Sequence, residues 1–304
     1  MKVPSGIIPG LNTPTTEKGE LDEESLRSLV RHNIEWGVDG LAVSIIAGEF
    51  YKFSDEERSR SFEIVIDETN GKVPVWAGVN HIGTEPSVKL GRQAKDLGAF
   101  GIISLPPFVG TKTDSAAYEH FSTLLTKVDI PMMIQDAEDF TGVHMRTNLY
   151  VELMKEYSNV TSLKVEGGET LKKIEDVLGT RELRNLSVLG GMGARLLFQE
   201  LKLGTNGSIP GSCLTDIVVK AYRYYTRGEY DMAEKQYADY REWINFTVLN
   251  SLSFTEIQKE TSRLRGVIKS SHTRSPHVPL GSEAKKRLAD LVRRVVPQEP
   301  ITAQ

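Results

Sequence analysis

The segment at residues 161–166, which reads T-S-L-K-V-E, carries the side chain best suited to covalent chemistry. If it is a strand, Lys164 and Glu166 share one face, and Leu163 and Val165 take the other. The two apolar residues predict that their face packs against helices, so the lysine points into the interior. Burial lowers the pKa of a lysine, and a neutral amine can attack a ketone carbon. The pattern therefore predicts a Schiff-base lysine; the alternative is a lysine that reaches water and pairs with Glu166.

Glu166 is the candidate acid or base beside that lysine. A carboxylate at this position could take a proton from the carbon next to an iminium, or protonate a leaving hydroxyl. A plain ion pair is the alternative. His81 is a second candidate acid or base, against the alternative of an ordinary loop histidine. The acidic residues near position 138 do not form a ligand set, so we expect no metal.

Eight short apolar runs could position these groups, and each is followed by an amphipathic stretch with helix signals. Asp22 is placed to cap the first helix, and Ser54 with Glu57 forms a capping box before the second. Thr84 is expected to cap the third helix, and Gly98 to end it. Eight strand–helix units predict an α/β fold, a (β/α)8 barrel; a doubly wound sheet is the alternative, because periodicity does not report closure. The runs lie near residues 8, 41, 75, 102, 132, 162, 188 and 207.

The strand signals stop near residue 228. We therefore assign residues 1–228 to the barrel and residues 229–304 to a C-terminal helical extension packed on it. Within the extension, helices are predicted at 229–250, 255–269 and 282–296.

The composition excludes several classes of function. Hydrophobic residues make up 39% of the 304 residues and charged residues 26%, as in globular proteins. The net charge is −4 and no basic stripe occurs, so no nucleic-acid partner is expected. The single cysteine, Cys213, leaves no disulfide within one chain and suits a reducing cytoplasm. The N-terminal apolar run is broken by prolines and glycines, and no run reaches the ~20 residues of a membrane span. We expect a cytoplasmic protein with no membrane partner.

The active site of such a barrel lies at the C-terminal ends of its strands. We therefore expect the catalytic pair to be surrounded by side chains from the other strand ends. These candidates for substrate binding are Asn80, His81, Ser104, Gln135, Asp136, Gly191 and Ile209.

Several short motifs occur in a specific order along nearly the whole chain. They are T-P at 13–14, A-G-E at 47–49, S-D-E-E-R at 54–58, P-V-W-A-G-V at 74–79, L-P-P-F at 105–108, T-G at 141–142, L-K at 163–164 and L-G-T-N-G-S-I at 203–209. In these motifs the chain resembles the dihydrodipicolinate synthase/N-acetylneuraminate lyase (DapA) superfamily.

The resemblance implies a (β/α)8 barrel with a C-terminal helical extension, often assembled as a homo-oligomer such as a dimer or tetramer. It implies lyase chemistry on pyruvate-like 2-oxo acids, through a Schiff base and with no metal or organic cofactor. The Schiff-base role falls on Lys164. The carboxylate-binding loop of the superfamily falls on Ile46 and Ala47, through their backbone N–H groups.

The chain departs from the superfamily pattern at four places. Gln135 stands where the superfamily has a proton-shuttling tyrosine, and Ile46 and Ala47 replace two threonines. Phe140 takes the place of the arginine that grips a second carboxylate in dihydrodipicolinate synthases, and Phe108 falls near the aromatic residue that one subunit lends to another. These departures argue against a dihydrodipicolinate synthase or an N-acetylneuraminate lyase.

One subgroup is more similar. The run M-I-Q-D-A, the P-P-F stretch and the K-x-E pair resemble L-2-keto-3-deoxyarabonate dehydratases, which also lack the tyrosine. The resemblance implies a Schiff-base dehydratase acting on a 2-oxo-3-deoxy sugar acid. The alternatives are a pyruvate-dependent aldolase or condensing enzyme of the same superfamily, and a degenerate barrel that binds a sugar acid without turnover.

Overall fold

The strands of the protein form one parallel sheet. The computed structural model describes residues 4–295. Every predicted strand is present, and each strand pairs in parallel with its neighbours. They are β1 (Gly6–Ile7), β2 (Leu41–Val43), β3 (Val75–Gly78), β4 (Gly101–Ser104), β5 (Met132–Ala137), β6 (Val160–Glu166), β7 (Ser187–Gly190) and β8 (Gly207–Ser208).

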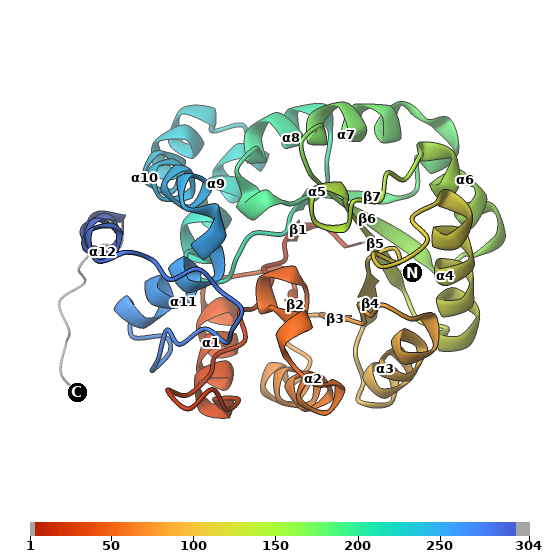
Figure 1. Cartoon of the computed structure of the whole chain (residues 1–304). Coiled ribbons are helices and arrows are strands. Elements are labelled where there is room, and N and C mark those ends of the chain that lie inside the picture. Colours follow the sequence, from red (N-terminus) through yellow and green to blue (C-terminus); the bar gives the residue numbers. More distant parts are fainter. Residues whose placement is uncertain (1–3, 296–304) are drawn as a thin grey trace.

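The sheet curls into a barrel. Its strand order is β1-β8-β7-β6-β5-β4-β3-β2, so the first strand lies beside the last. Gly10, just after β1, bridges both Ala42 of β2 and Gly211 after β8, which completes the ring. Figure 1 shows the strands in the middle and the helices around them. The barrel prediction is confirmed, and the doubly wound alternative is excluded.

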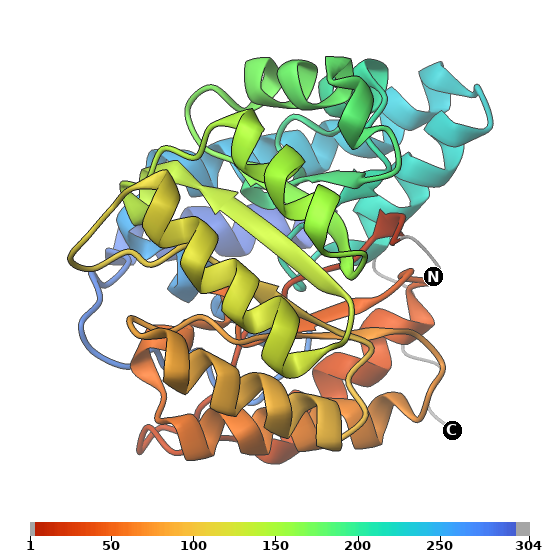
Figure 2. The ribbon, with the colours of Figure 1, turned by 90° about the vertical axis from the view of Figure 1, so that its right-hand side faces the viewer.

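Helices follow the strands on the outside, and Figure 2 shows them covering the sheet from the side. The helices of the barrel part are α1 (Glu23–Glu35), α2 (Asp55–Thr69), α3 (Thr84–Asp96), α4 (Asp114–Val128), α5 (Glu138–Thr141), α6 (Thr147–Glu156), α7 (Thr170–Gly179), α8 (Leu197–Leu203) and α9 (Thr215–Thr226). The C-terminal helices are α10 (Tyr230–Leu249), α11 (Phe254–Leu264) and α12 (Ser282–Val295).

The predicted helix ends are mostly confirmed. The Asp22 side chain caps α1, and the capping box at the start of α2 is complete. Gly98 follows α3 with a φ of 92°, a left-handed conformation that favours glycine. The prediction for Thr84 is wrong by one position: Gly83 is the N-cap, and the Thr84 hydroxyl pairs with His120 of α4 instead.

Side-chain alternation separates two apolar layers. The inner layer fills the barrel with residues such as Trp76, Met133 and Leu189. The outer layer packs the strands against the helices and includes Leu163 and Val165 of β6. This confirms that the apolar face of β6 is turned outward and the lysine face inward.

The C-terminal helices lie against one side of the barrel, where α10 packs along α9 and α12 contacts α10 and α11 (Figure 1). The Trp243 indole of α10 donates to Thr261 of α11 and joins the two helices. The middle helix ends at Leu264, earlier than the predicted 269. Among the helices described between residues 4 and 295, none is long and apolar enough to cross a membrane.

Candidate active site

Lys164 lies inside the barrel, near the C-terminal end of β6. Its register partners are Gln135 of β5 and Leu189 of β7, which both belong to the inner face. Its side chain is 5% exposed, and its Nζ donates to Glu166 Oε1 at 2.8 Å. The amine is therefore buried, as expected, with a carboxylate next to it. Lys164 and Glu166 form the pair that the spacing predicted.

Glu166 is held from three sides. Besides Lys164, the Gln135 amide donates to its Oε1, and the backbone N–H of Met192 donates to its Oε2 at 3.1 Å. Gly191 makes room for it: a Cβ there would lie 2.5 Å from Oε2, so a larger residue would displace the carboxylate. The glycine that follows β7, Gly191, therefore leaves the space that Glu166 occupies.

The Glu166 carboxyl is charged in this arrangement. Burial raises its pKa, but the Lys164 charge and the hydrogen bonds from Lys164, Met192 and Gln135 lower the pKa by more, leaving it below its ordinary value. A base must be ionised to accept a proton, so Glu166 is ready for that role near neutral pH.

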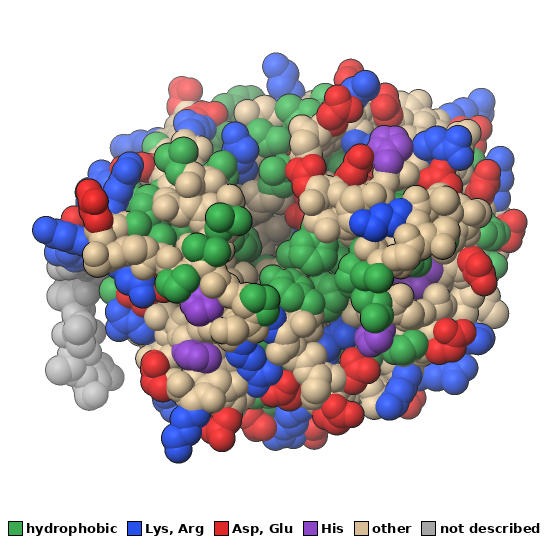
Figure 3. Space-filling view, in the orientation of Figure 1, with side chains coloured by type: hydrophobic (Ala, Val, Ile, Leu, Met, Phe, Trp, Pro, Cys, Tyr) green, Lys and Arg blue, Asp and Glu red, His purple; other side chains and the backbone are tan. Residues whose placement is uncertain are grey.

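A cavity of about 270 Å³ opens above this pair, between the barrel mouth and the C-terminal helices. Its walls are mainly apolar, while Arg195 brings a further charge to its lining. In the space-filling view the same face is hollowed at its centre, and hydrophobic side chains gather around the hollow (Figure 3). The lining side chains include Ile45, Ile46, Ala47, Met192, Ile209 and Phe254.

Ile46 and Ala47 lie where the resemblance places a carboxylate-binding loop. They are the first two residues of a 3-10 turn, Ile46–Gly48, and both line the cavity. The first N–H groups of a helical turn have no partner within it, so they can bind an anion. The turn is closed by Glu49 in the left-handed region, with a φ of 54°.

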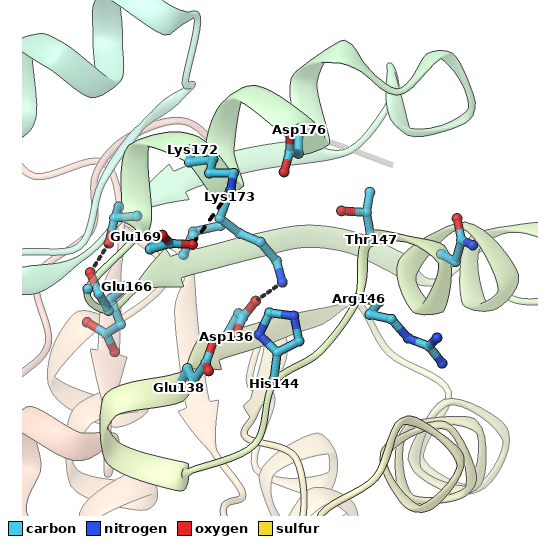
Figure 4. A pocket seen from close by; sticks show the side chains of 15 residues that line it. Asp136, Glu138, His144, Arg146, Thr147, Glu166, Glu169, Lys172, Lys173 and Asp176 are labelled. Carbon is cyan, nitrogen blue, oxygen red and sulfur yellow. Dashed lines mark hydrogen bonds and ion pairs between the residues drawn. The ribbon is translucent and has the colours of Figure 1, made fainter.

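Two predicted binding residues are turned away from Lys164. Asp136 follows the inward Gln135, so its side chain points outward and binds the Tyr150 hydroxyl and Lys173. Figure 4 shows Asp136 and Lys173 joined in a neighbouring pocket, whose lining also includes Glu166. Ser104 is also on the outer side of its strand, where its hydroxyl pairs with His120 Nε2. Their predicted place beside the substrate is corrected, because alternation sends them behind the sheet.

The remaining candidates sit at the edge of the site. Asn80 is buried, and its side-chain oxygen accepts from the backbone of Leu105, which ties the β3 and β4 ends together. The nearest acidic contact of His81 is Asp55, at 4.0 Å, and its Nδ1 accepts from the Gly83 backbone. The structure therefore brings Ile46, Ala47, Gln135, Gly191 and Ile209 to the Lys164–Glu166 pair, and leaves His81 in a loop outside the cavity.

Four aromatic rings cluster at the barrel mouth, which we call the aromatic cluster: Phe50, Tyr51, Phe108 and Phe140. Neighbouring rings lie 5.4–6.3 Å apart, and they come from the segments that follow β2, β4 and β5. Phe140 stands where dihydrodipicolinate synthases are expected to carry an arginine, so this side of the mouth is apolar. Tyr51 and Phe140 remain exposed.

Sequence reasoning missed the residues that reach the site from distant segments. Arg195 and the C-terminal residues Ile244, Thr247 and Phe254 line the cavity. The backbone N–H of Met192, which binds Glu166, was also missed. The glycine run at 190–193 was the available signal, since such runs mark close approach of backbone to other groups.

A (β/α)8 barrel with a buried lysine and a charged carboxylate at the C-terminal strand ends defines a barrel enzyme. The chain belongs to the dihydrodipicolinate synthetase family, a family of lyases, whose model matches residues 3–295. It is 30% identical over 294 residues to an uncharacterized DapA-like lyase of Thermofilum pendens, covering 95% of this chain and 97% of that protein. It is 28% identical over 293 residues to 4-hydroxy-tetrahydrodipicolinate synthase of Methanopyrus kandleri, covering 95% and 94%.

Solved structures show the same fold. YagE, a prophage protein of this family from E. coli K12 in complex with pyruvate, aligns with a TM-score of 0.89 at 25% identity, covering 96% of this chain and 98% of that one. Dihydrodipicolinate synthase from Rhodopseudomonas palustris gives a TM-score of 0.89 at 25% identity, covering 96% and 97%.

Proposed function

We propose that this protein is a Schiff-base dehydratase, which binds a 2-oxo-3-deoxy sugar acid through Lys164 and removes water from it. The observation that carries the proposal is the geometry of three inward side chains: Lys164, with Glu166 at 2.8 Å and Gln135 bonded to the same carboxylate oxygen. These groups supply a nucleophile, a base and a positioning amide.

The first half of the reaction makes an electron sink. Lys164 transfers a proton to Glu166 or to water, and the free amine adds to the C2 ketone of the substrate. A second amine proton moves to the C2 oxygen, and the proton that Lys164 gave up is returned to the same oxygen, which departs as water. Glu166 is then a carboxylate again, and the iminium that remains draws electrons from C3. Glu166 then removes a C3 proton, and the C–H electron pair forms the enamine.

The second half expels the hydroxyl. The enamine pushes its electrons toward C4 and breaks the C4–O bond, while protonated Glu166 returns the proton to the leaving oxygen, so that one water departs. Tautomerisation moves the remaining unsaturation to C5, and hydrolysis of the imine frees Lys164 and a 2,5-dioxo acid. The iminium itself is the electron sink, so the chemistry needs no metal or organic cofactor.

Dehydration is favoured over cleavage of the C3–C4 bond. Cleavage needs a base on the C4 hydroxyl, and the tyrosine expected there is replaced by Gln135, an amide that accepts no proton at neutral pH. The condensing reaction of dihydrodipicolinate synthases is disfavoured by Phe140, because an apolar ring offers no grip for a second carboxylate.

The substrate is oriented by its two ends. We place its carboxylate at the N–H groups of Ile46 and Ala47, which line the cavity close to the pair. The chain beyond C3 then extends along the cavity toward Met192 and Arg195. Arg195 can donate to hydroxyl or carboxylate oxygens at the far end.

Borohydride trapping tests the proposal. The protein is incubated with pyruvate or with 2-oxo-3-deoxy pentonates and hexonates, reduced, digested and analysed by peptide mass. The expected adduct lies on Lys164, and the unreduced reaction yields a 2,5-dioxo acid without pyruvate. Lys164→Arg serves as the matched control, because it keeps the charge and length but forms no adduct.

The other outcomes decide between the alternatives. Pyruvate with an aldehyde identifies an aldolase of the same family. Ligand binding without an adduct, for every 2-oxo acid, identifies a barrel that binds without turnover and overturns the Schiff-base assignment.

We also infer a cytoplasmic homo-oligomer, a dimer or tetramer. Support comes from Tyr51 and Phe140, which are 49% and 42% exposed side by side in the aromatic cluster. Exposed aromatic groups of this kind are typical of subunit contacts. Light scattering after gel filtration measures the mass, and a monomer at micromolar concentration contradicts the inference.

A further inference from the structure

A second glutamate, Glu200, is buried close to the site. It lies on α8 with 0% of its surface exposed. Neither of its carboxyl oxygens has a hydrogen-bond partner within residues 4–295. A buried ionised carboxylate without a partner is costly, so such a group either becomes neutral or serves a purpose that outweighs the cost.

Glu200 approaches the barrel from the outside of β7. A Cβ on Gly190 would lie 1.8 Å from Glu200 Oε2, so the carboxyl rests directly against the backbone of that glycine. The next residue, Gly191, makes the same kind of room for Glu166, on the inner side. Two carboxyl groups therefore flank the Gly190–Gly191 dipeptide, one on each side of the strand end.

The surroundings of Glu200 favour the neutral, protonated form of its carboxyl group. Burial raises its pKa to about 8, and the charge of Glu166 adds to the rise. From α10 the Tyr237 phenol faces it, with its own pKa raised by burial and by Glu200. Ser208 of β8, the register partner of Gly190, is buried as well, and α7 turns an apolar face toward the sheet.

We propose that Glu200 is a positioning residue for the catalytic pair: it stays neutral while the enzyme works, and its ionisation weakens the nucleophile at Lys164. A second negative charge behind Glu166 favours the ammonium form of a nearby lysine over the amine. The neutral carboxyl keeps that charge away. The positioning role rests on the proposed Schiff-base chemistry. The neutral state of the Glu200 carboxyl is independent of that chemistry.

The pH profile is the decisive measurement. The rate of borohydride-trappable adduct formation with pyruvate, or kcat/KM with the substrate, is measured from pH 6 to 10. In the wild-type protein the rate is expected to level off or fall above about pH 8. In Glu200→Gln it is expected to keep rising, so that the ratio of variant to wild type grows by about tenfold between pH 6.5 and 9.5, as for a one-unit shift.

Two variants separate titration from packing. Glu200→Asp keeps a carboxyl group, so its rate is still expected to level off or fall at alkaline pH. Gln258 of α11 is the matched control, because it is equally buried and rests against Gly211 in the same way, with 2.2 Å from its Oε1 to the Cβ position, but does not titrate. Gln258→Leu is expected to retain the wild-type shape of the profile.

Thermal melting tests neutrality separately. A carboxyl whose folded pKa is raised contributes stability below its unfolded value, near 4.5, and loses it as pH rises through about 8. The melting temperature of Glu200→Gln should therefore rise relative to that of wild type between pH 5 and 8.5. Glu200→Met replaces this variant if the amide variant misfolds. A constant difference overturns the neutral carboxyl. If adducts form and the pH profiles of wild type and Glu200→Gln superimpose, the positioning role is overturned. If no 2-oxo acid forms an adduct with wild type, but the melting temperature of Glu200→Gln still gains on wild type with pH, the proposed function is overturned instead.

Discussion

Two buried lysine–glutamate pairs in this molecule differ in their access to the cavity. In the first, Lys164 lies 2.8 Å from Glu166 at the edge of the cavity. In the second, Lys259 of α11 lies 2.7 Å from Glu49, which also binds Lys52 at 2.6 Å. The second pair joins the C-terminal helices to the loop after β2.

The two pairs differ in access rather than in chemistry. The Lys259 side chain is 0% exposed and that of Glu49 is 1% exposed, and Lys259 also donates to the backbone of His272. Burial lowers the pKa of Lys259, and Glu49 offsets this only in part. Burial alone would therefore point to Lys259, whose side chain is less exposed than that of Lys164. We propose Lys164 as the nucleophile because it combines burial with a place in the lining of the cavity.

The largest expected effect is on Lys164. Lys164→Ala should reduce turnover by at least about 10⁴-fold, because it removes the group that forms the covalent bond. Steady-state kinetics and circular dichroism measure activity and folding. Substantial turnover in a folded variant would falsify the assignment, and Lys259→Met is the control for the loss of a buried lysine.

Glu166 should show the next largest effect. Glu166→Gln keeps the shape of the side chain but removes the base, so kcat should fall by about 10²–10⁴-fold. The adduct on Lys164 should still form, which separates proton transfer from Schiff-base formation. If adduct formation is lost together with turnover, Glu166 serves the lysine itself rather than the elimination.

The second pair should affect stability instead. Lys259→Met leaves Glu49 with Lys52 alone, and breaking a buried pair costs about 3–5 kcal/mol. Urea unfolding should show this loss, while the yield of adduct per folded molecule stays near that of wild type. A large loss of adduct formation would show that this pair also shapes the catalytic loop.

Acid should weaken the second pair. Burial raises the pKa of Glu49, but Lys259 and Lys52 lower it by more. A carboxyl with a lowered folded pKa contributes stability above its unfolded value, and loses it as pH falls through the lowered value. The melting temperature of wild type should therefore drop more than that of Glu49→Gln as pH falls below 4.5, the ordinary pKa of a glutamate. Parallel curves would contradict this role.

An exposed ion pair should contribute least to the free energy of unfolding. Arg60 binds Glu23 at 2.7 Å, with side chains 42% and 45% exposed. Surface pairs contribute about 0–1 kcal/mol, so Arg60→Ala should unfold within about 1 kcal/mol of wild type. A larger loss of unfolding free energy would mean that burial does not predict how much each ion pair contributes to stability.

The local sequence pattern was enough to predict much of the barrel. Strand positions follow from short apolar runs, and the inward direction of Lys164 follows from alternation in β6 alone. The same rule, applied to an inward Gln135, turns the side chain of Asp136 outward. Alternation also turns Ser104 outward, but its partner His120 could not be inferred, because it comes from a helix sixteen residues on.

The sequence by itself determined which residues alternate, where helices begin, and that Lys164 and Glu166 stand on one face, because these depend on neighbours a few positions apart. Only the tertiary structure decided that helices α10 and α11 wall the cavity, that Met192 holds Glu166, and that Glu200 rests behind Gly190. Such contacts join residues ten or more positions apart, and their geometry depends on how strands and helices pack around the closed barrel.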